Sequence, residues 1–333
     1  MCDTHHNHGP THNVSVSKAG RLIPSTKRDP TRTTALQRRF LKAIVRMANK
    51  IGRESRKLIV KENAFGLAPR QDLQSLPPGL TVIGNTRFAF ETNPQKVQAF
   101  KQWLQDQIDA GLLEVDVDGY VRSAYKQAVI QSYVAARPIL DASAGFFEGT
   151  QAEFLVSAFE GPIPLDRIEL LATRSFENLR GITSQMSADL NRIFADGIAH
   201  GRSPRVIART IDNQIDGINR RRATRLARTE IVHTYAEGSL DSYERLGVEE
   251  VGVLAEWSTA GDDRVCPQCS SLEGQILTIK EARGLIPLHP NCRCAWIPYL
   301  DDLRRPGTGK TNPNPERLAA AKREAREAGA VLE

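Results

Sequence analysis

Apolar residues recur every three or four positions along most of the chain, the spacing that gives a helix one buried face. The clearest run predicts a helix from about residue 36 to about residue 65, and it consists of Leu36, Phe40, Ile44, Met47 and Ile51. Further helices are predicted over residues 93–111, 119–137, 166–179, 184–199, 203–215 and 218–246. Their starts at Asn-Pro or Ser-Pro and their stops at glycine follow the usual chemistry of helix caps.

The spacing of apolar residues changes to two after Gly247. The alternating residues are Val251, Val253, Ala255 and Trp257. Since successive side chains of a strand point to opposite faces, residues 250–258 are predicted to form a strand, and residues 276–279 a second one. Two short strands are also predicted over residues 80–83 and 87–90. The expected fold class is therefore mainly α with a small C-terminal β-element (α+β).

Breaks in these patterns divide the chain into four regions. Residues 1–34 are polar and basic and are expected to be a disordered leader. Residues 35–149 form a helical N-terminal region, and residues 150–300 form a second folded domain that contains most of the cysteines. Residues 301–333 are a charged C-terminal tail, rich in Ala, Arg and Glu.

Positive charge is concentrated at the N-terminus. The 333 residues carry a net charge of +6, but residues 1–62 hold 14 Lys and Arg against 4 Asp and Glu. Such a basic arm indicates a polyanion or an acidic protein surface as partner, or else a solvated leader with no partner. The chain has no apolar run long enough to span a membrane, and its polar first residues do not suggest a secretory signal.

Four of the five cysteines lie close together with one histidine. Cys266 and Cys269 form a C-x₂-C pair, and after nineteen intervening residues the chain offers His289, Cys292 and Cys294. Two short-spaced ligand pairs around a small β-element are typical of a tetrahedral Zn²⁺ site. The expected ligands are Cys266, Cys269, Cys292 and one of His289 or Cys294. Because four such ligands close the coordination shell, the zinc is expected to be structural and no catalytic residue is assigned.

Two other functions compete with a structural role for this region. Asp262 and Asp263, together with His289, could form the site of a metal-dependent nuclease acting on DNA. A zinc-containing DNA-binding regulator is the second rival, but residues 261–300 carry no net charge, which argues against it.

Two clusters upstream of the cysteines offer further candidate chemistry. Five arginines between residues 220 and 228 could bind phosphate or form salt bridges within the protein. Glu230 and His233 have the spacing of carboxylate-bridged metal bundles, but no second such pair is present in the sequence.

Several short motifs in fixed order resemble those of the tailed-phage head morphogenesis family, the Mu F-like minor head proteins. The similarity covers about residues 150–300, and its motifs lie at residues 225–230, 256–259, 265–269, 272–274 and 289–294, with Asp262 between them. The resemblance implies a minor capsid protein of the virion, associated with the portal vertex and not an enzyme. It also implies that the protein acts in head assembly and in DNA packaging or delivery. During assembly the protein is expected in the host cytoplasm. The implied partners are the portal protein, other head or scaffold proteins, and phage DNA through the basic N-terminal arm, with no membrane.

Overall fold

The computed structural model describes four long segments of the chain, residues 29–67, 92–140, 162–246 and 253–300. It also describes short pieces at residues 15–16, 22–23, 150, 152–154, 156, 319 and 323. The chain divides into two compact units: unit 1 contains residues 1–37, 118–171 and 228–333, and unit 2 contains residues 38–117 and 172–227. The strands predicted at residues 80–83 and 87–90 lie outside the described residues.

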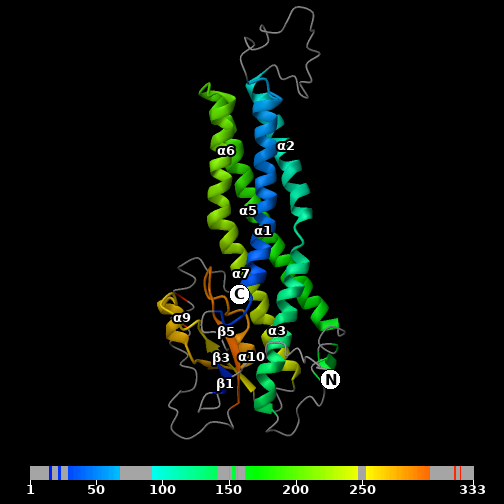
Figure 1. Ribbon diagram of the computed structural model, residues 1–333, viewed down its shortest axis with the longest axis vertical. Coiled ribbons are helices and arrows are strands. Elements are labelled where there is room, and N and C mark those ends of the chain that lie inside the picture. Colours follow the sequence, from blue (N-terminus) through cyan, green and yellow to red (C-terminus); the bar gives the residue numbers. More distant parts are fainter. Residues whose placement is uncertain are drawn as a thin grey trace, which may run out of the picture. The chain divides into compact units, whose positions relative to one another are not determined.

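Unit 2 is helical in its described part. Its helices are α1 (Thr34–Arg56), η1 (Lys57–Lys61), α2 (Asn93–Glu114), α5 (Pro162–Ala199), α6 (Pro204–Ile218), η3 (Asn219–Ala223) and the start of α7 (Thr224–Arg245). Figure 1 shows α1, α2, α5 and α6 side by side. Their core includes three aromatic rings that contact one another. Phe100 stacks on Phe194 at a centroid distance of 4.1 Å, and Phe65 meets both rings edge-on. The predicted apolar stripe of α1 is buried in this core.

Glycine lets two of these helices approach closely. A Cβ atom on Gly197 of α5 would lie 2.5 Å from Cγ1 of Ile207 on α6, a distance that real Cβ contacts do not reach. We therefore expect Gly197→Ala to lower the free energy of unfolding by about 1–3 kcal/mol, as overpacking of a core does. The matched control is Gly181→Ala in the same helix, where nothing lies within 4 Å of the added atom.

Thermal unfolding of the two variants checks this prediction. Gly181→Ala should leave stability unchanged or raise it by about 0.5–1 kcal/mol, because alanine favours the helix. Equal melting temperatures for the two variants would contradict the close packing of α5 on α6.

Unit 1 combines helices with a small sheet. Besides its parts of α5 and α7, it contains α3 (Val117–Leu140), α9 (Pro267–Leu272) and α10 (Ile279–Ala282). Its strands are β1 (Ser15–Val16), β2 (Leu22–Ile23), β3 (Val253–Ser258), β4 (Ile276–Leu277) and β5 (Ala295–Leu300). Helices α3 and α7 pack closely at Gly238, and the buried residues Ala128, Tyr235 and Ala295 join α3, α7 and β5 in one core. The expected fold class, mainly α with a small C-terminal β-element, is confirmed.

The C-terminal sheet is antiparallel, in the order β4-β3-β5. The alternation of apolar residues predicts strand β3, whereas it does not predict β5, because Pro298 indicates the end of the compact part. Pro298 lies opposite Ala255 in the register of β3 and β5. Proline is tolerated there because, among the described strands, β5 lies at an edge of the sheet, where its outward-facing backbone groups have no described strand to pair with.

Three glycines that were predicted to end helices lie inside them. Helix α5 continues through Gly181, α2 through Gly111, and α6 runs through Gly217 into η3 and α7 without a break. None of the three adopts a positive φ, the conformation that ends a helix at glycine, whereas Gly201 has φ +61° and does end α5. The buried stripe of α5 also continues across Gly181, from Leu179 to Met186.

Among the described residues, no helix combines the length and the apolar character needed to cross a lipid bilayer.

Candidate metal centre

The first cysteine pair forms a tight turn at the start of a short helix. Cys266 is the N-cap of α9, and Pro267 occupies the first helical position. The Cys266 sulfur accepts a hydrogen bond of 3.3 Å from the backbone N–H of Cys269. This bond meets one of the N–H groups that the first turn of a helix leaves without a partner. As a result, both sulfur atoms lie on the same side of the turn.

The second group of ligands lies in the turn that leads into β5. The backbone N–H of Cys292 donates to the carbonyl of His289 at 3.1 Å, and Asn291 adopts the left-handed conformation, with φ +65°. Nδ1 of His289 lies 2.9 Å from the carbonyl oxygen of Pro290. A carbonyl can only accept, so Nδ1 carries the proton in this bond and Nε2 keeps its lone pair for a metal or a thiol.

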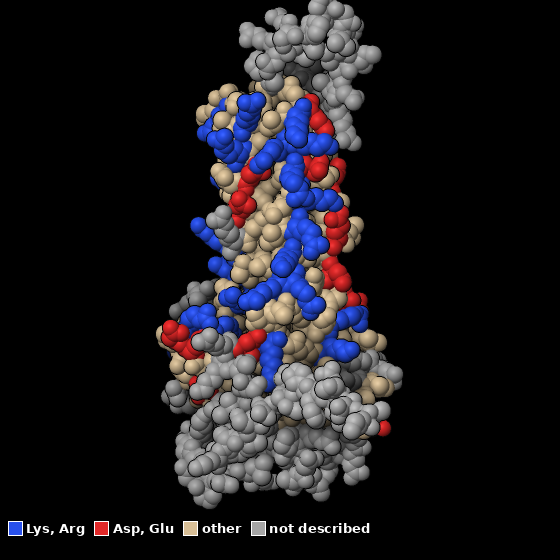
Figure 2. Space-filling view, in the orientation of Figure 1, with Lys and Arg blue, Asp and Glu red and all other residues tan. Residues whose placement is uncertain are grey.

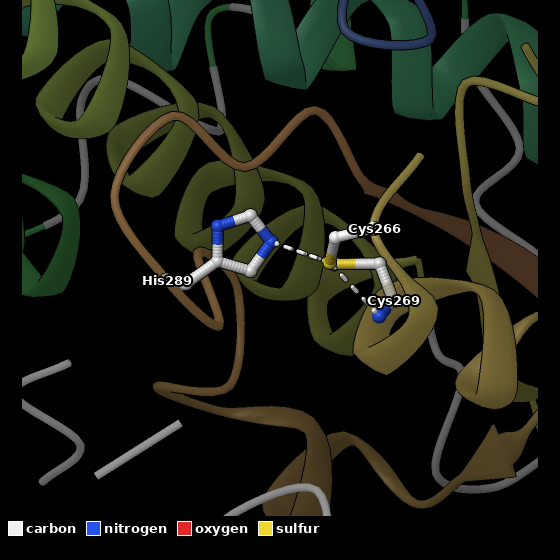
Figure 3. Close-up of side chains that lie close together, drawn as sticks. All are labelled: Cys266, Cys269 and His289. Carbon is white, nitrogen blue, oxygen red and sulfur yellow. Dashed lines mark hydrogen bonds between the residues drawn. The ribbon is translucent and has the colours of Figure 1, made fainter. Parts of the chain in front are cut away.

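The two turns bring their ligand atoms together. Nε2 of His289 lies 3.0 Å from the sulfur of Cys266 and 3.1 Å from that of Cys269 (Figure 3). The sulfur atoms of Cys269 and Cys292 are 3.8 Å apart. Two groups of three ligand atoms, each within 4.8 Å, share Cys269: one adds Cys266 and His289, the other Cys292 and Cys294. All five predicted residues therefore meet in one cluster.

The cluster suits zinc by its chemistry and by the separation of one pair of its sulfur atoms. Thiolate sulfur and imidazole nitrogen are the donors of structural zinc sites. Two thiolate sulfur atoms that bind the same tetrahedral zinc ion at 2.3 Å lie about 3.8 Å apart. The sulfur atoms of Cys269 and Cys292 have this separation. Cys269, Cys292 and Cys294 are buried, and Cys266 is half-buried, so bulk water has limited access to the ligands. The donor set therefore fits Zn²⁺.

The thiols also influence one another's ionisation. Hydrogen bonds with Cys269 and Cys294 lower the pKa of Cys292 well below its ordinary value, while the bond with Cys292 raises the pKa of Cys269. Crowded thiols behave in this way because one negative charge disfavours a second nearby. A bound Zn²⁺ would supply the positive charge that allows every ligand thiol to ionise.

Helix α7 supports the segment that carries the second ligand group. The backbone N–H of Asn291 donates to the hydroxyl of Thr229 at 3.2 Å, and Arg228 donates to the Asn291 side chain at 3.4 Å. One turn further along α7, Nδ1 of His233 lies 3.2 Å from the carbonyl oxygen of Ile286. The residues just before and after His289 are thus anchored to one helix.

Carboxylates on the following turns of α7 hold the same segment through Arg283. The guanidinium of Arg283 forms ion pairs of 3.2 Å with Glu237, 2.7 Å with Asp241 and 2.5 Å with Glu244. Glu237 also accepts from the backbone N–H of Gly284 at 2.9 Å. Burial raises the pKa of Glu237, and these contacts oppose that effect. The half-buried guanidinium of Arg283, paired with three carboxylates, therefore holds the segment that precedes His289 against α7.

Asp262 connects the two turns from outside the cluster. Its carboxylate accepts two hydrogen bonds from Arg293, of 2.8 and 2.5 Å, and one of 3.1 Å from Arg264. The bond with Arg293 contributes most to lowering the pKa of Asp262. Among the described residues, neither Asp262 nor Asp263 belongs to a group that could hold a metal ion. The geometry gives Asp262 a structural contact and does not assemble it with His289 as the nuclease reading requires.

The supporting residues of α7 were missed in the sequence, although a signal was present. Thr229, His233, Glu237, Asp241 and Glu244 recur every three or four residues and therefore share one face of the helix. The spacing of Glu230 and His233 suggests a metal motif, whereas in the structure His233 contacts the backbone carbonyl of Ile286. Of the arginines between residues 220 and 228, Arg222 lies 3.8 Å from Asp189, which agrees with the salt-bridge alternative.

The region of the chain that contains this cluster matches a known protein family. Residues 188–297 match the family model described as Phage Mu protein F like protein, which confirms the resemblance read from the motifs. The match begins near the end of α5, contains all of α6 and α7, and ends within β5. It therefore includes both turns that carry the candidate ligands and the face of α7 that supports them. No curated protein and no solved structure matches the chain.

Proposed function

We propose, because residues 188–297 match the Mu F-like family model, that the chain is a minor component of the phage head, located at the portal vertex and acting in head assembly. The observation that carries this proposal is the family match itself, which includes α7 and all five candidate zinc ligands. The proposed partners are the portal protein and other head or scaffold proteins. In this role the protein acts by occupying a position in the virion and not by catalytic turnover.

The cysteine cluster supports that role as a structural zinc site. The proposed ligands are Cys266, Cys269, His289 and Cys292, with Cys294 as a neighbouring thiol. The contacts of His289 with the first pair and the 3.8 Å separation of Cys269 and Cys292 favour this set. When bound, the ion would tie the start of α9 to the turn before β5. Four protein ligands leave no position for a catalytic water.

A basic surface in unit 2 supports contact with DNA as part of the same role. Nine exposed cations lie on α1 and η1: Arg38, Arg39, Lys42, Arg46, Lys50, Arg53, Arg56, Lys57 and Lys61. They follow the helix opposite its buried stripe, and Figure 2 shows Lys and Arg side chains running along the bundle. Lys50 pairs with Glu114 at 2.5 Å, and Arg56 pairs with Asp212. These nine residues are called the α1 basic face below.

The length of the α1 basic face fits the backbone of a DNA duplex. At 1.5 Å per residue, the helix rises by about 35 Å from Arg38 to Lys61, close to the length of one turn of B-DNA. The cations recur every three or four residues and can meet successive phosphates without reading bases. We propose that the protein contacts packaged DNA through this face, independently of sequence.

Purified virions provide the test of the head role. Mass spectrometry should find the chain at low stoichiometry relative to the major capsid protein, and its absence from the particles would refute a structural role in the virion. A variant with Asp262→Asn and Asp263→Asn should still enter particles and support infection, because the zinc ligands remain. Asp263→Asn alone is the control, since Asp263 is exposed and the Asp262 contacts with Arg293 stay intact. Normal assembly with loss of both infectivity and a metal-dependent DNA cleavage would instead favour the nuclease.

A further inference from the structure

Unit 1 contains an apolar groove that is separate from the cysteine cluster. The groove has a volume of about 600 Å³ and is bordered by α3, by α7, by β5 and by the turn at residues 30–32. Its lining includes Ile130 and Val134 of α3, Tyr235 and Tyr243 of α7, and Trp296 and Ile297 of β5. None of the five candidate zinc ligands borders it. Its volume lies within the range of about 300–1,000 Å³ that is typical of ligand sites.

The walls of the groove are held in place by hydrogen bonds among themselves. The Tyr235 hydroxyl donates to Gln131 at 3.0 Å, and the Tyr243 hydroxyl donates to the backbone carbonyl of Trp296 at 3.1 Å. Gln127 donates to the carbonyl of Arg32 at 2.6 Å. Burial raises the pKa of both tyrosines, so their hydroxyls stay neutral. The two tyrosine hydroxyls and the Gln127 amide are therefore engaged, whereas Nε1 of Trp296 is buried without a hydrogen-bond partner among the described residues. The groove offers a preformed surface that is mainly apolar.

Two features show that the groove is open to an occupant. Val134 is 39% exposed. It is one of the few large apolar residues that are exposed to solvent in the described part of the structure. Ile130, one turn before it, is only half-buried. Both lie on the face of α3 that borders the groove, so covering that face would remove apolar surface from water, which is favourable.

The charge around the groove limits what the occupant can be. Arg32 and Lys126 are its charged lining residues among those described, and no carboxylate lines it. Lys126 is exposed and can turn toward a bound group. A ligand with negative charge beside an apolar part would match this border, whereas a basic ligand would be repelled.

We propose that this groove binds a short peptide segment of a partner protein, one that inserts apolar side chains and carries carboxylates beside them. The fixed walls and the volume suit several side chains, and the cationic border selects for acidic flanks. That the partner is another head protein rests on the proposed function, but the chemistry of the groove does not.

Fluorescence anisotropy with two labelled peptides tests this inference on the full chain. The first peptide has an apolar, aromatic centre with aspartates on both sides, and the second has lysines in their place. We expect the acidic peptide to bind at least about tenfold more tightly, a difference of about 1.4 kcal/mol. Val134→Glu should abolish this binding by placing a carboxylate in the groove. The control, Val206→Glu, changes a valine of similar exposure on α6 and should leave the affinity unchanged.

Each other result would overturn the inference. Absence of binding, equal binding of both peptides, or unchanged binding by Val134→Glu would exclude an acidic, apolar peptide as the occupant. Glutamate is a good helix former at an exposed position, so circular dichroism should show Val134→Glu folded. Binding seen only after removal of residues 301–333 would mean that the groove holds the protein's own tail. Because purified protein suffices, these outcomes are independent of incorporation into virions.

Discussion

Replacing Cys269 with serine should release the bound zinc and lower the melting temperature more than any other single substitution discussed above. Cys269 contacts His289 and Cys292 and belongs to both groups of three ligand atoms, so its loss disrupts the whole cluster. Apparent binding free energies of structural zinc are about 10–16 kcal/mol in zinc-finger peptides, and they act as folding free energy. We expect elemental analysis to find about one zinc per chain in the natural protein and far less in Cys269→Ser.

Two matched variants identify the fourth ligand in the same experiment. Cys294→Ser should keep the zinc and most of the stability, whereas His289→Ala should lose both, because His289 contacts the first cysteine pair. The reverse pattern would assign Cys294 instead. Ser270→Ala, at an exposed position beside Cys269, controls for substitution in the turn. Zinc below about 0.2 per chain in folded, reduced natural protein would refute the metal centre.

The parts of the fold that depend on local pattern were predictable from the sequence. The buried stripe of α1, the Asn-Pro start of α2 and the C-x₂-C turn each arise from residues a few positions apart. The glycine errors are not explained by local pattern. At Gly111 the side chain of Met47 in another helix fills the space that a Cβ atom would need, whereas nothing lies within 4 Å of a Cβ atom at Gly181 or Gly217. A contact between distant residues leaves no trace in the local pattern.

The support of the metal centre was unpredictable for the same reason. Glu237 and Arg283 are 46 positions apart, and Thr229 and Asn291 are 62 apart, so no local spacing reveals that they meet. The cluster of five candidate ligands could be predicted because cysteine and histidine have few other reasons to gather at such spacing. The helix that holds them uses common polar residues, whose roles become visible only when the partner segment is in place.

Neutralising three cations of the α1 basic face should weaken DNA binding strongly at low salt. In the variant with Arg38→Gln, Lys42→Gln and Arg46→Gln, the changed side chains are all exposed. Glutamine is a good helix former, so the buried stripe of α1 and the bundle should remain intact. Deleting residues 1–62 would be a poorer test, because it removes core residues such as Phe40 and Ile44.

The salt dependence of affinity separates contact with phosphates from a general effect of charge. Each lost phosphate contact reduces the slope of log affinity against log salt by about 0.9, so three lost contacts reduce it by about 2.7. Two duplexes of unrelated sequence should bind equally well, since phosphates carry no sequence information. The control variant, with Arg202→Gln, Arg205→Gln and Arg209→Gln, removes the same charge from exposed positions just before α6 and in its first two turns. Because these arginines lie off the α1 basic face, the control should retain most of the slope. Equal losses in the two variants would mean that net charge, and not the α1 basic face, attracts the DNA.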